Sequence, residues 1–278
     1  MPLVLTLRES PSIPLEVDAV RVEVVREQTL DQVRATLIPH GNRQEPLGEF
    51  FEVTGSARDD QQVVWAGGCS RVKRIGEKHA CGQMLITGDA GMHLGAEMTG
   101  GEITVRGHVA DWAGAEMRGG RLRIDGNAGN CLGAGYRGAT RGMTGGEILV
   151  TGSAGDEVGT ALRRGLIAVA GSVGHAAGFG MIAGSLMFFG DVGRHCGAGM
   201  KRGTISLFST TRRAELLPSF HYSCTDRPTF LAVYLRHLKR LDFPLPNDCV
   251  DANYDRYCGD LIELGKGEIL VRHSDNER

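Results

Sequence analysis

The sequence lacks the features that mark several common classes of protein. No apolar run approaches the roughly 20 residues that a membrane-spanning helix needs, and the opening MPLVLTLRESPSIP does not have the basic and then apolar order of a secretory signal. An excess of one charge is also missing, because 31 basic residues stand against 33 acidic ones. We therefore expect a cytoplasmic protein that binds neither a membrane nor nucleic acid.

Cysteine pairs and proline are scarce as well. The seven cysteines are an odd number and none stands in a CxxC arrangement, which argues against a disulfide framework and a zinc ribbon. Proline occurs nine times, whereas glycine takes 41 of 278 positions, about double the usual share of roughly 7%. Low proline and strong apolar periodicity exclude a collagen-like array and a disordered chain. The glycine therefore indicates a fold with tight corners at regular intervals.

The glycines form three columns that repeat along the chain. Successive members stand 19 residues apart, with one interval of 26. All three columns share this interruption, so a single loop inserted between Gly133 and Met143 explains it. The first column is Gly88, Gly107, Gly126, Gly152, Gly171 and Gly190; the second is Gly76, Gly95, Gly114, Gly133, Gly159, Gly178 and Gly197; the third is Gly101, Gly120, Gly146, Gly165, Gly184 and Gly203.

Apolar residues between the glycines alternate as they do in a short strand. Each unit reads Gly-x-apolar-x-apolar-x-Gly, as at Met84 with Ile86 and at Ile103 with Val105, so one face is buried and the other is solvated. A unit of 19 residues is too short for a βαβ crossover. The sequence therefore predicts an all-β fold, a right-handed parallel β-helix (β-solenoid) whose coils stack about 4.8 Å apart.

The repeat divides the chain into three expected parts. These are a β-rich N-terminal cap over residues 1–62, the glycine-repeat β-helix over 63–208 and a C-terminal cap over 209–278. In the N-terminal cap, two alternating runs are interpreted as strand-like: Leu3, Leu5 and Leu7, and Val20, Val22 and Val24.

The C-terminal cap is predicted to contain a helix over about residues 228–241, because Asp226 and Pro228 suit a helix start. We expect this helix to cover the last coil, and a strand-like run follows at 268–271. The apolar positions with helical spacing are Phe230, Val233, Tyr234, His237, Leu238 and Leu241.

Residues one coil apart become neighbours, so the columns can be searched for chemistry. Asp156, His175 and Arg194 share a column and could form an acid/base relay, but no nucleophile stands beside them. We interpret them as a solvated ladder of opposite charges. The methionine column (Met98, Met117, Met143, Met181, Met200, with Leu162) is interpreted as core, and Cys131 and Cys196 as buried small hydrophobes.

The next column contains residue types that bind metals: His93, Trp112, Cys131, Glu157, Ala176 and His195. Ligands of one zinc ion must lie within about 2.3 Å of it, yet a coil carrying Trp112 separates His93 from Cys131. We therefore predict no metal site and no catalytic residue in this chain.

The repeats point to a family. GEITVRGHVADWAGAEMRGG, GEILVTGSAGDEVG and GDVGRHCGAGMKRGTISLF resemble the C subunits of formylmethanofuran dehydrogenases and, more closely, the C subunit of the bacterial formyltransferase/hydrolase complex. The glycine pattern is also similar to the C-terminal domain of glutamate synthase. The resemblance covers about residues 63–208, and the following LLPSFHYSCTDRPTFLAVYLRHL favours the bacterial complex.

The resemblance implies a cytoplasmic hetero-oligomer with catalytic subunits A, B and D. In that family a formyl group passes from formyl-tetrahydromethanopterin to a methanofuran-type carrier and is released as formate during formaldehyde oxidation. The C subunit is the non-catalytic scaffold, and no cofactor is assigned to this chain. Two alternatives stay open: the C subunit of a molybdenum or tungsten formylmethanofuran dehydrogenase, and a glutamate synthase-type glycine-repeat subunit.

One exposed feature of the repeat is basic. Five cations stand just before third-column glycines and two more are in the inserted loop, and we name this set the basic edge: Arg118, Arg163, Arg164, Lys201 and Arg202, with Arg137 and Arg141. Our hypothesis is that it guides an anionic group, such as the polyglutamyl tail that the resemblance implies for the carrier. The alternative is solubilising charge together with salt bridges to other subunits.

Overall fold

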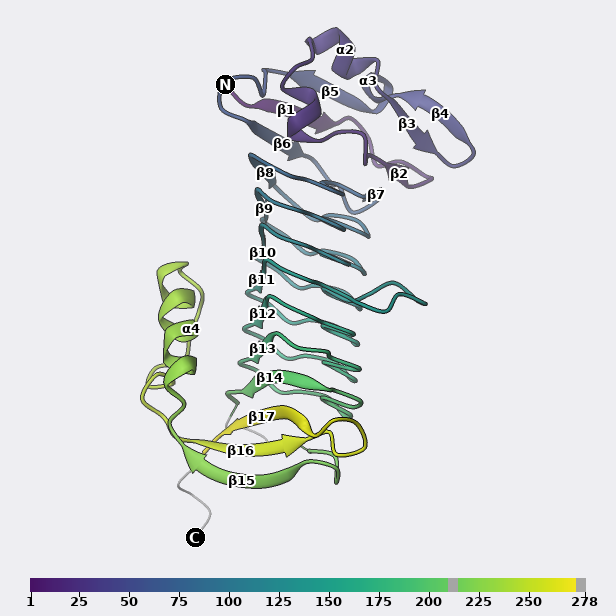
Figure 1. Cartoon of the computed structure of the whole chain (residues 1–278). Helices are drawn as coiled ribbons and strands as arrows, with labels where there is room; N and C mark the ends of the chain where they lie inside the picture. The colour runs from purple at the N-terminus through teal and green to yellow at the C-terminus, as the bar shows by residue number, and fades with distance from the viewer. Residues whose placement is uncertain (210–214, 274–278) are drawn as a thin grey trace.

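Strands dominate the computed structural model, which describes residues 1–209 and 215–273. Of these described residues, 31% are in strands and 9% in helices. One 13-stranded sheet runs in the order β15-β16-β17-β14-β13-β12-β11-β10-β9-β8-β6-β1-β5. Its strands are stacked along the long axis of the molecule, with the N-terminal region at one end and β15 to β17 at the other (Figure 1). Residues 210–214 and 274–278 of the predicted C-terminal cap lie outside the described residues.

The central strands are parallel and pair in the register that the glycine columns predict. Ile103 pairs with Met84 on one side and Leu122 on the other, so residues one repeat apart lie side by side and the predicted alignment is confirmed. The strands are β8 (Gln83–Ile86), β9 (Glu102–Val105), β10 (Arg121–Ile124), β11 (Glu147–Val150), β12 (Leu166–Val169), β13 (Ser185–Phe188) and β14 (Arg202–Leu207).

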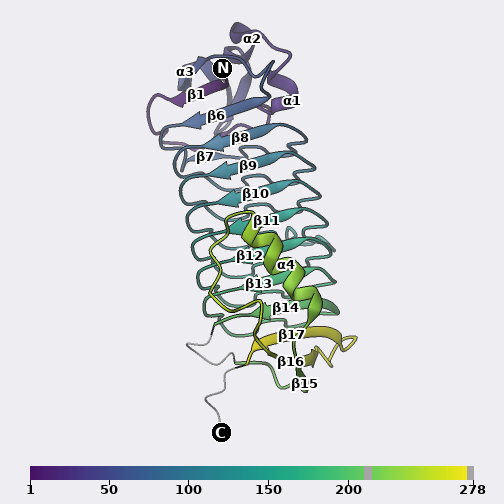
Figure 2. The ribbon, with the colours of Figure 1, turned by 90° about the vertical axis from the view of Figure 1, so that its left-hand side faces the viewer.

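Each repeat also bonds to the next away from these strands. Parallel bridges join Cys69, Ala90, Val109, Ala128, Ala154, Val173 and Val192 in order. On another side, the N–H of Gly114 donates to the carbonyl of Leu94 at 2.8 Å. The repeats are therefore turns that lie flat on one another (Figure 2). The methionine column fills the interior, since Met98, Met117, Met143 and Met200 are each 0% exposed, as predicted.

Glycine does two different jobs in these turns. The third column holds left-handed backbone, as at Gly203 with φ +100°, which residues with a Cβ rarely adopt. The first column does not need that conformation. At Gly190 a Cβ would lie 2.5 Å from the carbonyl carbon of Gly171 on the preceding turn, so only a residue without a side chain allows the two backbones to approach so closely.

The N-terminal region is β-rich but includes short helices. Strands β1 (Leu3–Leu7), β5 (Phe51–Thr54) and β6 (Gln62–Ala66) extend the large sheet. A small sheet has the order β4 (Arg43–Pro46), β3 (Leu37–His40), β2 (Leu15–Glu16) and β7 (Val72–Lys73). The helices are α1 (Val22–Val25), α2 (Leu30–Arg34) and α3 (Leu47–Phe50). Two sheets and three single-turn helices therefore make up this end of the molecule.

One strand-like prediction in this region is wrong. Leu3, Leu5 and Leu7 do lie on β1, but Val22 and Val24 lie on α1. Val22 and Val25 are both buried, and their spacing of three places them on one side of a helical turn. An alternation of only three residues is too short to separate a strand from such a turn.

The predicted C-terminal helix exists as α4 (Thr229–Arg240), but its expected position is wrong. It lies along the outer face of the stacked strands, over β11 to β14, and not across the last turn (Figure 2). The last turn is instead covered by β17 (Lys266–Arg272), which continues the sheet beside β14, then β16 (Tyr254–Gly259) and β15 (His221–Asp226). The predicted strand-like run at 268–271 lies within β17.

The sheet itself explains where α4 packs. The third position of each strand faces outward, and it is Thr104 on β9 and Arg123 on β10 but Leu149 on β11, Ala168 on β12 and Met187 on β13. The last three are buried in one cluster with Leu231, Leu235 and Leu238 of α4. Apolar residues on both faces of a strand require a cover on each. This outward apolar run was the sequence signal for the position of the helix.

The buried face of α4 matches the predicted one in part, because Leu238 is buried and Tyr234 and Leu241 pack partly buried against the same cluster. Leu231, Leu235 and Leu238 are buried, whereas Val233 is 66% exposed and Phe230 36%. Both sets have helical spacing, and the sheet selects the leucines. At the far end of α4, Arg123 Nη1 donates to the carbonyl of Leu241 at 2.7 Å, so an arginine of β10 satisfies a carbonyl at the helix C-terminus.

Candidate functional surfaces

The column of Asp156, His175 and Arg194 is a hydrogen-bonded ladder. The N–H of His175 donates to Asp156 Oδ1 at 2.6 Å, and the N–H of Arg194 donates to His175 Nδ1 at 2.9 Å. Upstream, Asp111 and Asn130 continue the series, each accepting the N–H one repeat further on. The side chains therefore act as acceptors for corner backbone groups. The predicted pairing of opposite charges is replaced by these bonds to the backbone.

A second ladder of the same kind lies beside the first. It consists of Asp89, His108, Asn127 and Ser153, each accepting the N–H one repeat further on. Both histidines accept through Nδ1, so that nitrogen carries no proton. The two ladders hold the corners of successive turns together, and their polar atoms are used for structure.

The column that contains metal-ligand types is a row of residues with left-handed backbone conformation. His93, Trp112, Cys131, Glu157, Ala176 and His195 have φ between +56° and +65°. Within residues 1–209 and 215–273, no group of three or more His, Cys, Asp or Glu side chains could hold a metal ion. Cys131 Sγ lies 3.8 Å from Glu157 Oε2, a contact between two side chains of neighbouring turns.

An aromatic cluster anchors the inserted loop. Tyr136 stacks on Trp112 with ring centroids 5.1 Å apart, and its hydroxyl lies 3.0 Å from His93 Nδ1. The N–H of Tyr136 donates to Glu116 Oε1 at 3.2 Å. Burial raises the pKa of Tyr136 to about 12, and burial together with the nearby Arg74 cation lowers the pKa of His93. Both rings are therefore neutral at physiological pH.

The two cysteines singled out in the repeats are buried. Burial raises the pKa of Cys196 to about 12. The pKa of Cys131 is raised to about 11, by burial first and then by the Glu157 carboxylate. A thiol must ionise to act as a nucleophile or as a metal ligand, so neither is suited to catalysis.

The basic edge forms a ridge with its cations on alternate turns. Arg118, Arg163 and Lys201 share one column, in which the N–H of each donates to a methionine carbonyl of the preceding turn. Arg118 pairs with Glu97 at 2.9 Å. Across the part of the chain that the structure describes, Arg163, Arg164, Lys201 and Arg202 make no salt bridge. Arg137 and Arg141 are exposed on a loop that projects from the stack between β10 and β11 (Figure 1).

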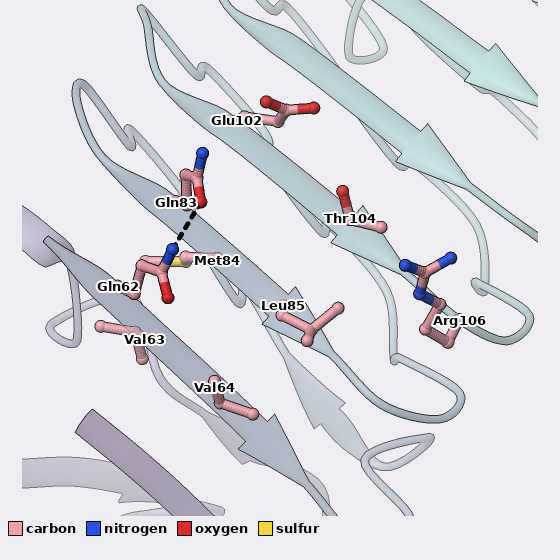
Figure 3. A pocket seen from close by; sticks show the side chains of 9 residues that line it. All are labelled: Gln62, Val63, Val64, Gln83, Met84, Leu85, Glu102, Thr104 and Arg106. Atoms are coloured by element: carbon pink, nitrogen blue, oxygen red, sulfur yellow. Dashed lines mark hydrogen bonds between the residues drawn. The ribbon is translucent and has the colours of Figure 1, made fainter. Parts of the chain in front are cut away.

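A shallow hollow lies on the outer face of β6, β8 and β9, beyond the end of α4. Its volume is about 230 Å³, and Val64 and Leu85 form its floor, with Thr104 and Arg106 to one side (Figure 3). Gln62 Nε2 donates to Gln83 Oε1 at 2.8 Å on the rim. Its lining residues include no histidine, cysteine or serine, and Glu102 is the one carboxylate among them. Elsewhere, none of the described helices has the length and hydropathy to cross a bilayer.

The class of protein follows from these features: a chain of stacked glycine-repeat turns whose polar columns are used in building the stack. No family model matches the sequence. The C subunit of molybdenum-containing formylmethanofuran dehydrogenase 1 from Methanothermobacter marburgensis is 42% identical over 95 residues, which cover 34% of this chain and 24% of the relative. The C subunit of tungsten-containing formylmethanofuran dehydrogenase 2 from Methanothermobacter thermautotrophicus is 39% identical over 97 residues, 34% of this chain and 36% of the relative.

A solved structure matches over nearly the whole chain. It is a chain of the formyltransferase/hydrolase complex FhcABCD from Methylorubrum extorquens, crystallised with methylofuran. The identity is 31% and the TM-score 0.90, over 98% of this chain and 100% of that one. The matches to the two curated relatives span only about a quarter and a third of those proteins. The chain belongs to the family formed by the C subunits of formylmethanofuran dehydrogenases and of the formyltransferase/hydrolase complex.

Proposed function

We propose that this chain is the non-catalytic structural subunit of a cytoplasmic formyltransferase/hydrolase complex. Its partners would be the catalytic subunits A, B and D, which move a formyl group from formyl-tetrahydromethanopterin to a methanofuran-type carrier and release formate. The stacked turns would be a right-handed parallel β-helix, since a strand that crosses over to a parallel neighbour in one sheet does so with right-handed sense in about 98% of cases.

One observation supports this proposal above the others. The FhcABCD chain is matched in structure over 98% of this chain, at 31% identity, and the dehydrogenase subunits are matched in sequence over 34% of it. The end-to-end match includes the N-terminal sheets and the C-terminal helix and strands. Those regions lie outside the glycine repeat, so the likeness to the FhcABCD chain is not confined to the repeat.

The experiment is affinity purification of the tagged chain from its own cells. Mass analysis of the co-purifying chains should give catalytic subunits of a formyltransferase/hydrolase, and elemental analysis should give neither molybdenum nor tungsten in stoichiometric amount. A chain that purifies alone would contradict the proposal.

A second candidate function is that of the C subunit in a molybdenum or tungsten formylmethanofuran dehydrogenase. The higher sequence identity, 42% over 95 residues compared with 31% for the FhcABCD chain, favours it. The same purification decides between the two, because a stoichiometric molybdenum or tungsten cofactor in the complex would select the dehydrogenase.

The basic edge is proposed to guide the anionic tail of the carrier. Its cations repeat along the ridge, with Arg163 half-buried and the others exposed, and such a row suits a chain of carboxylates. Arg163→Glu with Arg164→Glu should weaken carrier binding by the intact complex at least tenfold, and more at low salt. Arg58→Glu, on an exposed residue of the N-terminal region, is the matched control. Unchanged carrier affinity in an assembled complex would remove the proposal.

A further inference from the structure

The loop between β16 and β17 carries three exposed apolar side chains at one end of the stack. Leu261 is 52% exposed, Ile262 84% and Leu264 54%, and we name these three residues the terminal knob. They project from a turn of only six residues, 260–265. Single exposed apolar residues need no explanation, but three in one turn mark a contact surface.

The knob is held in place from beneath. The buried Asp260 accepts hydrogen bonds from the N–H of Gly199 at 2.9 Å and from the N–H of Ile262 at 3.1 Å. Its carbonyl accepts the N–H groups of Glu263 and Gly265, and the N–H of Leu261 donates to Ser219. A turn fixed by five such bonds keeps its apolar side chains outward before any partner arrives, which lowers the entropy lost on binding.

The surroundings of the knob are positively charged. Arg202 of β14 pairs in register with Lys266 of β17, and Lys266 directly follows the loop. Lys201, Arg202 and Lys266 are all exposed, and over residues 1–209 and 215–273 none of them makes an ion pair. Glu263 is the one exposed acidic residue within the loop, since Asp260 is buried. The knob is thus an apolar projection beside three cations.

We propose that the terminal knob is a docking element for a neighbouring subunit whose surface has an apolar pocket with an acidic rim. Leu261, Ile262 and Leu264 fill the pocket, and Lys201, Arg202 and Lys266 meet the rim. Apolar anchors in a pocket carry most of the affinity of an interface, and complementary charge sets orientation and specificity. This inference rests on the proposed function, because it needs a hetero-oligomer.

Two other occupants fit the observations less well. In a symmetric contact between two copies of this chain, each subunit uses the same patch, so Lys201, Arg202 and Lys266 would face their own equivalents and repel them. A lipid bilayer would have to take in Glu263 together with the apolar residues around it, and a carboxylate is costly to insert. A second protein with acidic groups meets neither obstacle.

The test uses the complex purified through a tag on this chain. Leu261→Ser, Ile262→Ser and Leu264→Ser are combined, and native mass spectrometry counts the retained subunits. We expect the amount of one neighbouring subunit in the purified complex to fall at least tenfold, and the amounts of the other subunits to stay unchanged. Val233→Ser is the matched control, because Val233 is an equally exposed apolar residue (66%) on the outer side of α4, and it should change retention less than twofold.

A charge variant tests the second half of the proposal. Lys201→Glu, Arg202→Glu and Lys266→Glu together should release the same subunit, whereas Arg163→Glu with Arg164→Glu, higher on the ridge, should leave it bound. A photoreactive amino acid at position 262 should cross-link to an apolar segment of that subunit next to acidic residues.

The contrary outcomes are distinct. Three outcomes would each overturn the docking proposal while the proposed function stands. The serine variant retains every subunit, or position 262 cross-links to a second copy of this chain. In the third, the wild-type chain sediments with phosphatidylserine vesicles and the serine variant does not. A wild-type chain that purifies without any partner would overturn both.

Discussion

The imidazole of His175 accepts, through Nδ1, a 2.9 Å hydrogen bond from the backbone N–H of Arg194, the residue one repeat further along the chain. The acceptor comes from one turn and the donor from the next, so the bond exists only when the turns are stacked. The same relationship recurs from Asp111 to Arg194. Side chains that resemble a catalytic column thus satisfy N–H groups at the corners, where the strand ladder does not reach.

His175→Ala should reduce the free energy of unfolding by about 1 kcal/mol, because the N–H of Arg194 loses its partner in the protein. His175→Asn should keep most of the wild-type free energy of unfolding, since Asn130 accepts the equivalent hydrogen bond two turns earlier. Urea unfolding of the three proteins measures this. Equal losses for alanine and asparagine would show that the acceptor is unimportant.

Gly190→Ala should cost about 3 kcal/mol or more, because the added Cβ would lie 2.5 Å from the backbone of Gly171 and one turn would have to move away from the other. Gly68→Ala is the control: an added Cβ there meets nothing within 4 Å, and the effect should stay within about 0.5 kcal/mol. Thermal and urea unfolding compare the two. A tolerated Gly190→Ala would mean that the turns are not packed backbone to backbone.

Leu235→Ala should loosen α4 without dismantling the sheet. Leu235 is 0% exposed and lies in the cluster with Leu149 and Met187, so the truncation should cost about 2 to 5 kcal/mol. Hydrogen exchange should speed up in 229–240 and change little in β8 to β10. Val233→Ala, on the exposed side of the same helix, should leave exchange unaltered, and uniform acceleration across all strands would argue against a separately docked helix.

The turn that bears the terminal knob should loosen in acid. Burial alone would raise the pKa of Asp260, but hydrogen bonds from the Gly199 N–H and the Ile262 N–H, together with the nearby Ser219 side chain, outweigh it and lower the pKa below its ordinary value. A depressed folded-state pKa means that the stabilisation is complete above the ordinary aspartate value of about 3.9 and is lost as the pH falls through the lower folded value.

Hydrogen exchange at the amides of residues 199 and 262, corrected for the intrinsic pH dependence, measures this loss. Protection in the wild-type chain should hold from pH 7 to pH 5 and fall in more acidic solution, and Asp260→Asn should lower protection at pH 7 and abolish most of the pH dependence. The same acid-induced loss in the asparagine variant would assign the effect to another group.

The sequence predicts the stacked part of the fold well because the same pattern of glycine and apolar residues recurs in every repeat. An apolar pair such as Ile103 and Val105 between glycine columns recurs in each unit, so the pairing register follows directly. The glycine columns also predict the tight corners, but the sequence did not separate the close approach at Gly190 from the left-handed backbone at Gly203.

The position of α4 was missed for a physical reason. It depends on Leu149, Ala168 and Met187, which point outward where Thr104 and Arg123 stand in earlier turns, and attention to inward positions alone overlooks them. The anchoring of the inserted loop was hidden for another reason: Tyr136 and His93 are 43 residues apart, and only the stacking of turns brings them together. The terminal knob lies outside the repeat, where no column constrains its exposure.

The central claim is that this chain supplies structure and not chemistry to a formyl-transferring complex. Formate release from the formylated carrier, measured with the isolated chain and with the intact complex at equal concentration, tests that claim most directly. We predict release by the complex and none by the chain alone. Formate release by the isolated chain, in proportion to its concentration and free of other subunits, would contradict the account.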